Sequence, residues 1–231
     1  MNSIHQHSAH DASARPKSDD ALRITEIFYS LQGESRSVGL PTVFVRLTGC
    51  PLRCKYCDTA YAFTGGQWRS IDDVVSSVKT YDTPWVTVTG GEPLAQKNCL
   101  RLLTSLCDSG YQVSLETGGA LPVNEVDQRV VKVMDLKTPG SGEADRNLLD
   151  NIQYLTPADQ VKFVVCDEQD YRWAKKIIEE HQLTEKCEVL MSPSYGQMEA
   201  ATLAEWILRD GLVVRFQLQL HKILWGDKRG R

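Results

Sequence analysis

The sequence lacks any apolar run that approaches the roughly 18 residues needed to span a bilayer. Its polar N-terminus also lacks the apolar segment of a secretory signal. It has no excess of positive charge, since 26 Lys and Arg face 30 Asp and Glu for a formal net charge of −4. A general nucleic-acid-binding protein would show a basic face. We therefore expect a cytoplasmic protein with no membrane partner and no direct nucleic-acid contact.

Internal repeats and long linkers are also absent, and 231 residues is a length typical of one globular domain. Residues 1–21 are too polar to bury a core, so we predict a disordered tail there, with His5, His7 and His10 unstructured rather than metal-binding. Residues 22–231 are predicted to form a single domain.

Short β-rich runs alternate with segments of helical spacing along this domain. Helices are predicted after the N-cap Ser70, over Leu100–Leu106 up to Gly110, around Trp173, and over Ala200–Arg209. Strands are predicted at Leu22–Tyr29, Thr42–Leu47, Trp85–Thr89, Tyr111–Leu115, Val130–Leu136, Gln160–Val165, Glu188–Met191 and Val213–Leu220.

This alternation is typical of an α/β fold with a mainly parallel sheet wrapped by helices. A complete eight-fold α/β barrel takes about 250 residues, and several connections here lack a helical pattern. We therefore predict a partial, open TIM-like barrel of about six parallel strands with fewer outer helices. In such folds the functional residues follow the carboxyl ends of the strands.

The seven cysteines show no disulfide pattern, and three of them stand close together as Cys50-Pro-Leu-Arg-Cys54-Lys-Tyr-Cys57. The other four, Cys99, Cys107, Cys166 and Cys187, are predicted to be packing residues. Three thiolates on one tight loop can converge on a soft metal centre. Structural zinc and ordinary electron-transfer clusters take four protein ligands, and no second Cys-x-x-Cys or Cys-x-x-His is present. Three thiolates suit a four-iron cluster with one open iron, and zinc remains the alternative.

The spacing C-x3-C-x2-C, with aromatic Tyr56 before the last cysteine, resembles the signature of the radical S-adenosylmethionine (SAM) superfamily. Gly90-Gly91-Glu92-Pro93, after a predicted strand, resembles the GGEP motif of the same superfamily. The resemblance implies a [4Fe-4S] cluster whose open iron binds SAM, which is cleaved to a 5′-deoxyadenosyl radical. It also implies SAM contacts from Tyr56, Asp58, Gly90, Gly91, Glu92, Glu116, Asp135, Leu136 and Lys137.

Further segments narrow the resemblance. Leu31-Gln32-Gly33-Glu34, Cys57-Asp58-Thr59 and the C-terminal Gln219-Leu220-His221-Lys222 resemble the 7-carboxy-7-deazaguanine synthase family of the queuosine (7-deazapurine) pathway, which serves tRNA modification. The resemblance runs from about Ile24 to Gly226. It implies ring contraction of 6-carboxy-5,6,7,8-tetrahydropterin to 7-carboxy-7-deazaguanine. In that reaction a hydrogen is removed from C6, ammonia leaves, and the hydrogen returns to regenerate SAM.

The resemblance also implies a substrate site. Arg46 offers a planar cation for the pterin carboxylate, while Gln32, the Gly33 backbone and Glu34 match the donors and acceptors of the pterin edge. Alternating Gln217, Gln219 and His221 are expected on one side of the last strand, with His221 as a tentative proton carrier. The predicted substrate residues are Leu31, Gln32, Gly33, Glu34, Arg46, Thr89, Gln219 and His221. Thr59 is the predicted ligand of Mg²⁺.

The sequence departs from the family pattern at Ser35, where glycine is usual. We expect a small residue to be tolerated unless a positive φ is required there. The resemblance further implies a homodimer and a reductant such as flavodoxin or ferredoxin. The alternatives are a radical-SAM activase that installs a glycyl radical on another enzyme, and a noncatalytic zinc or iron–sulfur binding module.

Overall fold

The structure, a computed structural model, describes residues 20–230, so the predicted disordered tail lies almost wholly outside the described residues. The first strand already begins at Ala21, one residue before the predicted domain boundary. Over residues 20–230, no helix is both long and apolar enough to cross a membrane.

The described chain forms one nine-stranded sheet in the order β3-β1-β2-β4-β5-β6-β7-β8-β9. The strands are β1 (Ala21–Leu31), β2 (Pro41–Leu47), β3 (Gln67–Ser70), β4 (Trp85–Gly90), β5 (Gln112–Thr117), β6 (Val131–Asp135), β7 (Gln160–Val165), β8 (Glu188–Pro193) and β9 (Arg215–Phe216). β1 is antiparallel to β2 and β3, whereas every pair from β2 to β9 is parallel. β3 and β9 are edges of the sheet, so the barrel is open, as predicted.

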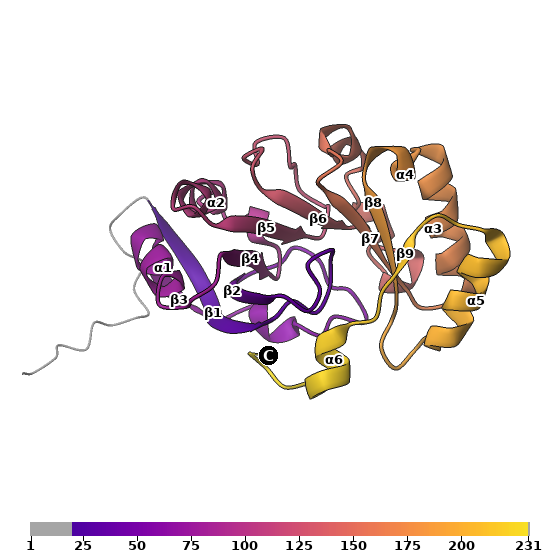
Figure 1. Cartoon of the computed structure of the whole chain (residues 1–231), viewed down its shortest axis with the longest axis horizontal. Helices are drawn as coiled ribbons and strands as arrows, with labels where there is room; N and C mark the ends of the chain where they lie inside the picture. Colours follow the sequence, from indigo (N-terminus) through magenta and orange to yellow (C-terminus); the bar gives the residue numbers. More distant parts are fainter. Residues whose placement is uncertain (1–19, 231) are drawn as a thin grey trace, which may run out of the picture.

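Helices cover the two ends of the sheet, and few cover its middle. α1 (Ile71–Val78) lies at the end that holds β1 and β3, α2 (Cys99–Asp108) lies next to α1 and over β5, and α3 (Glu168–Glu180), α4 (Leu183–Lys186) and α5 (Ala200–Asp210) lie beside β7–β9 (Figure 1). The connections from β5 to β6 and from β6 to β7 contain only loops and short 3-10 turns. These connections are the ones without a helical pattern in the sequence, so the prediction of fewer outer helices is confirmed.

Local hydrogen bonds and backbone conformation set the ends of the helices. The Ser70 hydroxyl accepts a hydrogen bond from the Asp73 amide and caps α1, and the Asp167 carboxylate does the same for Asp170 at the start of α3. After α2, Gly110 has a φ of +88°, a conformation that favours glycine. The predicted boundaries at Ser70 and Gly110 are therefore confirmed.

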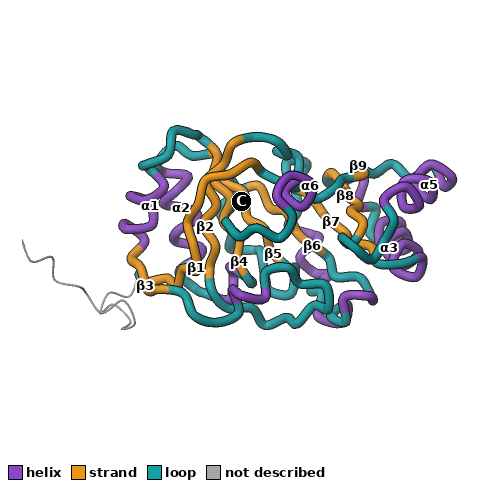
Figure 2. Tube along the Cα trace, turned by 90° about the horizontal axis from the view of Figure 1, so that it is seen from below, coloured by secondary structure: helices purple, strands orange, loops and turns teal. Residues whose placement is uncertain are grey.

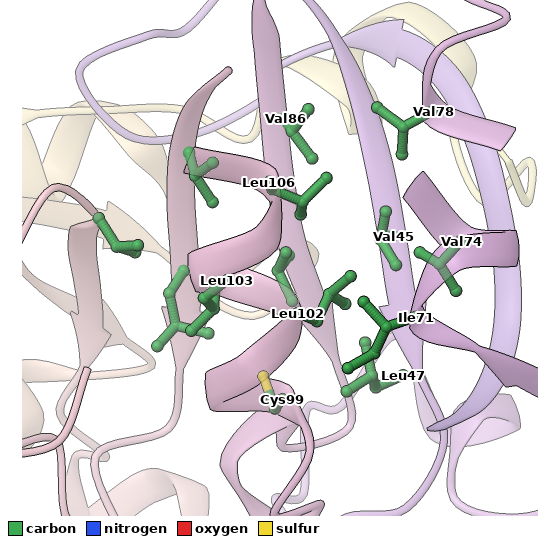
Figure 3. Packing of buried hydrophobic residues seen from close by; sticks show 14 of the residues in the cluster. Val45, Leu47, Ile71, Val74, Val78, Val86, Cys99, Leu102, Leu103 and Leu106 are labelled. Atoms are coloured by element: carbon green, nitrogen blue, oxygen red, sulfur yellow. The ribbon is translucent and has the colours of Figure 1, made fainter. Parts of the chain in front are cut away.

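The core has two halves. The valines and leucines on the inner faces of α1 and α2 pack on β2, β4 and β5, and Val45, Val74, Val86 and Leu102 are at most 1% exposed (Figure 3). A second cluster, which includes Phe163 and Tyr171, packs α3 and α5 on β6–β8. Cys99, Cys107 and Cys187 are buried in these clusters, as predicted, while Cys166 is only half-buried.

The prediction of a strand over Val213–Leu220 is wrong. Only Arg215 and Phe216 pair with β8, and helix α6 (Leu220–Trp225) begins where the strand was expected to end. The chain leaves the sheet because it is bound to the loop between β1 and β2. The Gln217 side-chain Nε2 donates to the Ser35 carbonyl oxygen at 2.7 Å, and the Leu220 backbone amide donates to that of Gly33 at 2.9 Å.

The β1–β2 loop thus bridges the open side of the barrel. Arg36 of this loop donates its backbone amide to the Gln160 side chain at 2.6 Å, and its guanidinium pairs with Glu188 at 2.8 Å. Figure 2 shows α6 lying apart from α5, back over the middle of the sheet. Segments from the two ends of the sequence therefore meet across the gap between β1 and β9.

Replacement of the cap residue should weaken the fold locally. We expect Ser70→Ala to lower the free energy of unfolding by about 1 kcal/mol, because the Asp73 amide loses its partner. Denaturant unfolding followed by circular dichroism measures this change. The matched control is Ser76→Ala, an exposed serine inside the same helix, which should leave stability unchanged or slightly higher. An equal loss in both variants would contradict the cap assignment.

Candidate active site

A pocket of about 390 Å³ lies at the carboxyl ends of the parallel strands. The alternation of side chains along each strand builds its wall. Val133, Asp135 and Lys137, two residues apart on and after β6, all face it, as do Lys162 and Val164 of β7. The volume falls within the range of small-molecule sites.

This pocket brings together the predicted cluster, SAM and substrate residues, except for Glu92 and Leu136. The residues that line it include Leu31, Gln32, Gly33, Glu34, Arg46, Cys50, Cys54, Tyr56, Cys57, Asp58, Thr59, Thr89, Gly90, Gly91, Glu116, Asp135, Lys137, Gln219 and His221. These residues come from segments far apart in the sequence, so their meeting in one pocket depends on the fold as well as on the local motifs.

The three clustered thiols all reach the pocket from the loop after β2. The loop is fixed by neighbouring turns, since the Lys55 amide donates to the Ser141 carbonyl oxygen at 2.9 Å and the Arg53 amide to Glu143 at 2.6 Å. Burial raises the pKa of each thiol, so iron loading must displace protons. Among the described residues, no three His, Cys, Asp or Glu side chains are already arranged around a metal position.

The paired glycines allow the strand β4 to touch the cysteine loop. A Cβ on Gly90 would come within 2.4 Å of the Leu47 carbonyl oxygen, and one on Gly91 within 2.4 Å of that of Gly49 and 2.7 Å of Cys50 Cβ. The Glu92 amide also donates to the Gly49 carbonyl oxygen at 2.8 Å. A side chain at either position would therefore collide with the backbone that leads into Cys50.

Glu92 and Leu136 lie outside the pocket lining. The Glu92 side chain is 0% exposed, and its carboxylate accepts hydrogen bonds from the amides of Gly118 and Leu94 and from the Thr117 hydroxyl. It joins β4 to the end of β5. Leu136 is part of the second core cluster. Both side chains lie behind the pocket wall, and their predicted contact with SAM stays a prediction.

Two buried oxygens beside the thiols fit a polar ligand. The Tyr56 hydroxyl and Asp135 Oδ1 are buried without a hydrogen-bond partner among the described residues, and both residues line the pocket. Burial raises the pKa of Tyr56, which keeps its hydroxyl a donor. An unpartnered buried polar atom is costly. A bound molecule with amino and hydroxyl groups, such as SAM, would satisfy both.

Arg46 is held rigidly at the other side of the pocket. Its Nε donates to Glu26 Oε1 at 2.7 Å, and the Tyr61 hydroxyl donates to the same oxygen at 2.7 Å. The guanidinium lies 5.7 Å from the Phe28 ring centroid and 5.9 Å from that of Tyr61. Sequence reasoning did not identify Glu26. The sequence signal that could have identified it is its alternation with Phe28 on β1.

The Gln32-Gly33-Glu34 segment is fixed by polar contacts from several strands. The Gln32 amide nitrogen donates to the Thr87 hydroxyl at 3.1 Å and to Glu116 at 3.2 Å, and Gln219 donates to Glu34 Oε1 at 2.8 Å. A Cβ on Gly33 would meet His221 Nδ1 at 2.4 Å. Gln219 and His221 therefore reach the pocket, although they do so from the start of α6 and not from a strand.

Ser35 has a φ of +67°, so this position does require the left-handed conformation that glycine favours. Its hydroxyl lies 3.0 Å from that of Ser37, and its side chain is 1% exposed. Small size and a local hydrogen bond let serine occupy the position at some conformational cost.

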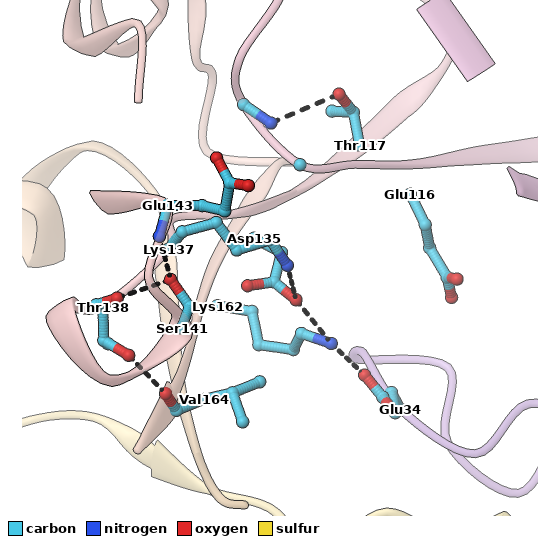
Figure 4. A network of polar contacts seen from close by, with 12 residues as sticks. Glu34, Glu116, Thr117, Asp135, Lys137, Thr138, Ser141, Glu143, Lys162 and Val164 are labelled. Atoms are coloured by element: carbon cyan, nitrogen blue, oxygen red, sulfur yellow. Dashed lines mark hydrogen bonds and ion pairs between the residues drawn. The ribbon is translucent and has the colours of Figure 1, made fainter. Parts of the chain in front are cut away.

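A buried charge network crosses the pocket floor, and its central residue was not predicted. Lys162 Nζ contacts Glu34 Oε2 and lies 3.1 Å from Asp135 Oδ2, while Lys137 Nζ lies 3.1 Å from the same Asp135 oxygen (Figure 4). The sequence signal that could have identified Lys162 is its inward-facing position on a strand. A charge buried there needs oppositely charged partners.

The charges of this network shift the pKa values of the pocket carboxyls in different directions. Burial by itself would raise the pKa of Glu34 and of Asp135. The Lys162 ammonium at Glu34, and Lys137 with Lys162 at Asp135, outweigh this effect and lower both values. Burial and the nearby charge of Glu34 instead raise the pKa of Glu116. Glu34 and Asp135 are therefore held as carboxylates.

The cysteine loop ends in a small oxygen-rich group. The Thr59 hydroxyl donates to Asp58 Oδ1 at 2.8 Å, and Asp58 Oδ2 lies 3.8 Å from His221 Nε2 and 3.6 Å from Lys222 Nζ. Burial would raise the pKa of Asp58, but contacts with His221, Thr59 and Lys222 lower it. The group links the thiol side of the pocket to α6.

Comparison with known proteins places the chain in a family. The Radical SAM superfamily profile matches residues 44–137. The chain is 49% identical to the 7-carboxy-7-deazaguanine synthase of Chlorobaculum tepidum, over 90% of this chain and 97% of the relative. It is 42% identical to that of Koribacter versatilis, over 88% and 97%. The crystal structure of QueE from Escherichia coli superposes with a TM-score of 0.72 at 20% identity, covering 89% of this chain and 100% of that one.

The open parallel sheet, with its cysteine loop at the carboxyl end of β2, defines a radical SAM enzyme. Within that superfamily the chain belongs to the 7-carboxy-7-deazaguanine synthase family. The predicted fold and family are confirmed. This assignment decides against the glycyl-radical activase and against the noncatalytic metal-binding module. Membership in the superfamily also implies a [4Fe-4S] cluster and SAM.

The glycine contacts make a prediction about the cluster. We expect Gly91→Ala to displace the backbone before Cys50 and to lower the iron bound per chain after reconstitution by at least about half, because its Cβ would overlap backbone atoms. Iron and sulfide analysis measures this. The Ser76→Ala protein serves as the control for handling. Full iron content in a folded Gly91→Ala protein would contradict the proposed role of Gly91.

Proposed function

We propose that this chain converts 6-carboxy-5,6,7,8-tetrahydropterin to 7-carboxy-7-deazaguanine with loss of ammonia. The observation that carries the proposal is the placement of the three thiols and of a polar set suited to a carboxylated pterin on one pocket. Its relatives named 7-carboxy-7-deazaguanine synthase support the same reaction. The product would enter queuosine biosynthesis.

Cys50, Cys54 and Cys57 would hold the cluster. When bound, the cluster and SAM supply the 5′-deoxyadenosyl radical, which is the cofactor's own chemistry. The chain's task is to hold both ligands in place. The Tyr56 hydroxyl and Asp135 Oδ1 lack partners among the described residues, so they are available to the polar groups of SAM. Glu116, Lys137 and the backbone of Gly90 and Gly91 complete the proposed SAM side.

The proposed substrate side contains a cation, Arg46, and an anion, Glu34. Glu26 and the two aromatic rings fix the Arg46 guanidinium, and Glu26 uses only Nε. The terminal nitrogens can then grip the substrate carboxylate as a bidentate fork. Glu34 and Gln32 present acceptors and a donor to the pterin ring edge. Leu31, Gly33, Thr89 and Gln219 complete the proposed lining, and His221 is a candidate to carry a proton when ammonia leaves.

The function is tested by an anaerobic assay of the reconstituted protein with SAM, dithionite, Mg²⁺ and the tetrahydropterin. We expect 7-carboxy-7-deazaguanine, detected by mass, and its loss in Cys54→Ala. Cys187→Ala, at a buried cysteine far from the pocket lining, is the control and should keep activity. SAM cleavage without this product would retain the superfamily chemistry and overturn the proposed substrate.

Arg46→Lys tests the carboxylate fork. A lysine keeps the charge but loses the planar pair of donors, so we expect KM for the tetrahydropterin to rise roughly tenfold while kcat changes far less. The matched control is Arg69→Lys, in which the native guanidinium contacts Asp73 and Ser77 of α1. Steady-state kinetics with varied substrate measures both. An unchanged KM in Arg46→Lys would remove Arg46 from the substrate site.

Mg²⁺ is proposed to bind between the Thr59 hydroxyl and the substrate carboxylate. The hard-oxygen chemistry of Thr59 beside Asp58 supports this. We expect Thr59→Ala to raise the Mg²⁺ concentration for half-maximal activity roughly tenfold, and Thr59→Ser to restore it. Activity that does not respond to Mg²⁺ removal by a chelator would exclude the ion.

A one-electron reductant such as flavodoxin or ferredoxin is proposed as the electron donor, and a homodimer as the assembly. Support for the dimer comes from the short edge strand β9 and the apolar side chains near it, since Leu208 is 80% and Val213 is 81% exposed.

A further inference from the structure

Lys162 stands between the two halves of the site, although neither motif nor family resemblance pointed to it. It extends from the middle of β7, and its side chain is 12% exposed. Its Nζ contacts Glu34 Oε2 on the proposed substrate side and Asp135 Oδ2 on the proposed SAM side, the latter at 3.1 Å (Figure 4). One ammonium is therefore shared by carboxylates from two different ligand sites.

Glu34 depends on this ammonium for both its position and its charge. Its other oxygen, Oε1, accepts from Gln219 at 2.8 Å, and its backbone amide donates to Gln32 Oε1 at 3.1 Å. The charged groups that face it are Lys162 and His221, which favour the carboxylate, and Glu116, which opposes it. Lys162 makes the largest favourable contribution to its lowered pKa. Asp135 anchors Lys162 in turn.

A pterin ring edge presents adjacent N–H donors, and a carboxylate can accept from both through its two oxygens. A protonated Glu34 would instead direct an O–H donor at the ring and lose one acceptor. We propose that Lys162 is a positioning residue for substrate recognition, which holds Glu34 as an oriented carboxylate for the N–H edge of the pterin. This inference rests on the proposed function.

A second role is chemically open to Lys162, because an ammonium can bind the substrate carboxylate directly. Comparing two ligands separates the roles. 6-Carboxypterin has both the ring edge and the carboxylate, whereas unsubstituted pterin has the ring edge alone. Both rings are fully oxidised and lack the tetrahedral C6 from which the proposed reaction removes a hydrogen, so their dissociation constants report binding without catalysis. Isothermal titration calorimetry of the reconstituted protein with SAM measures them.

We expect Lys162→Met to weaken binding of both ligands by a similar factor of roughly tenfold or more, since the ring-edge acceptor is disturbed for each. The effect should also depend on pH. Without the ammonium, Glu34 is buried near Glu116 and Asp135, which raises its pKa. As pH falls from about 8 to 6 the carboxyl protonates and affinity drops in the variant. The wild type, with its lowered Glu34 pKa, should change little, and His221 is common to both proteins.

The matched control is Lys132→Met. Lys132 is another buried strand lysine, paired with Asp159 at 3.0 Å with side-chain exposures of 5% and 1%, and it does not line the pocket. Its loss should lower the thermal midpoint but leave both dissociation constants and their pH dependence unchanged. Lys162→Arg, which keeps the charge, should bind within roughly threefold of wild type. If Lys162→Met does not fold, the polar Lys162→Gln takes its place.

Three results would overturn the assignment. The first is unchanged affinity at both pH values in a folded Lys162→Met or Lys162→Gln protein. The second is a loss confined to 6-carboxypterin, which would place Lys162 on the carboxylate. The third is an equal loss in Lys132→Met, which would reduce the effect to general stability. If wild type binds both pterins but yields no 7-carboxy-7-deazaguanine, the proposed function fails while the binding series still judges Lys162.

Discussion

The site depends on compensation of buried charge. Glu34, Glu116 and Asp135 come from different segments of the chain and converge on one pocket, and carboxylates cannot stay ionised there without partners. Lys162 and Lys137 supply the positive charge around Asp135, and Lys162 extends it to Glu34. Because Lys162 of β7 contacts Asp135 of β6 and Glu34 of the β1–β2 loop, the ion pairs that satisfy these charges also fix two strands and this loop relative to one another.

The open barrel also requires contacts across its open side, and the β1–β2 loop provides them. A sheet with free edges at β3 and β9 leaves a gap, and polar contacts from Gln217, Gln219 and Leu220 to the β1–β2 loop cross it. Residues proposed to recognise the pterin therefore also hold the barrel together. Substrate recognition and architecture share one set of contacts, and the loop residues Gln32, Gly33 and Ser35 beside these contacts are buried.

Much of the fold followed from local pattern. The β7 bounds agree with prediction, and the Ser70 cap and the Gly110 ending are found where the sequence placed them. These features depend on contacts within a few residues, which a sequence displays directly. The strand expected over Val213–Leu220 failed for the opposite reason. Its polar alternation is real, but long-range hydrogen bonds to Gly33 and Ser35 draw the chain out of the sheet.

The sequence by itself determined the family, the three thiols and most side chains of the pocket, because the chemistry of the cluster and the ligands demands those residue types in fixed local order. Only the tertiary structure decided which of these side chains meet. It turned the Glu92 carboxylate toward β5, gave the paired glycines a contact with the backbone before Cys50, and set Glu26 against Arg46. It also placed Lys162 between Glu34 and Asp135, a meeting of side chains from three parts of the chain that no local pattern encodes.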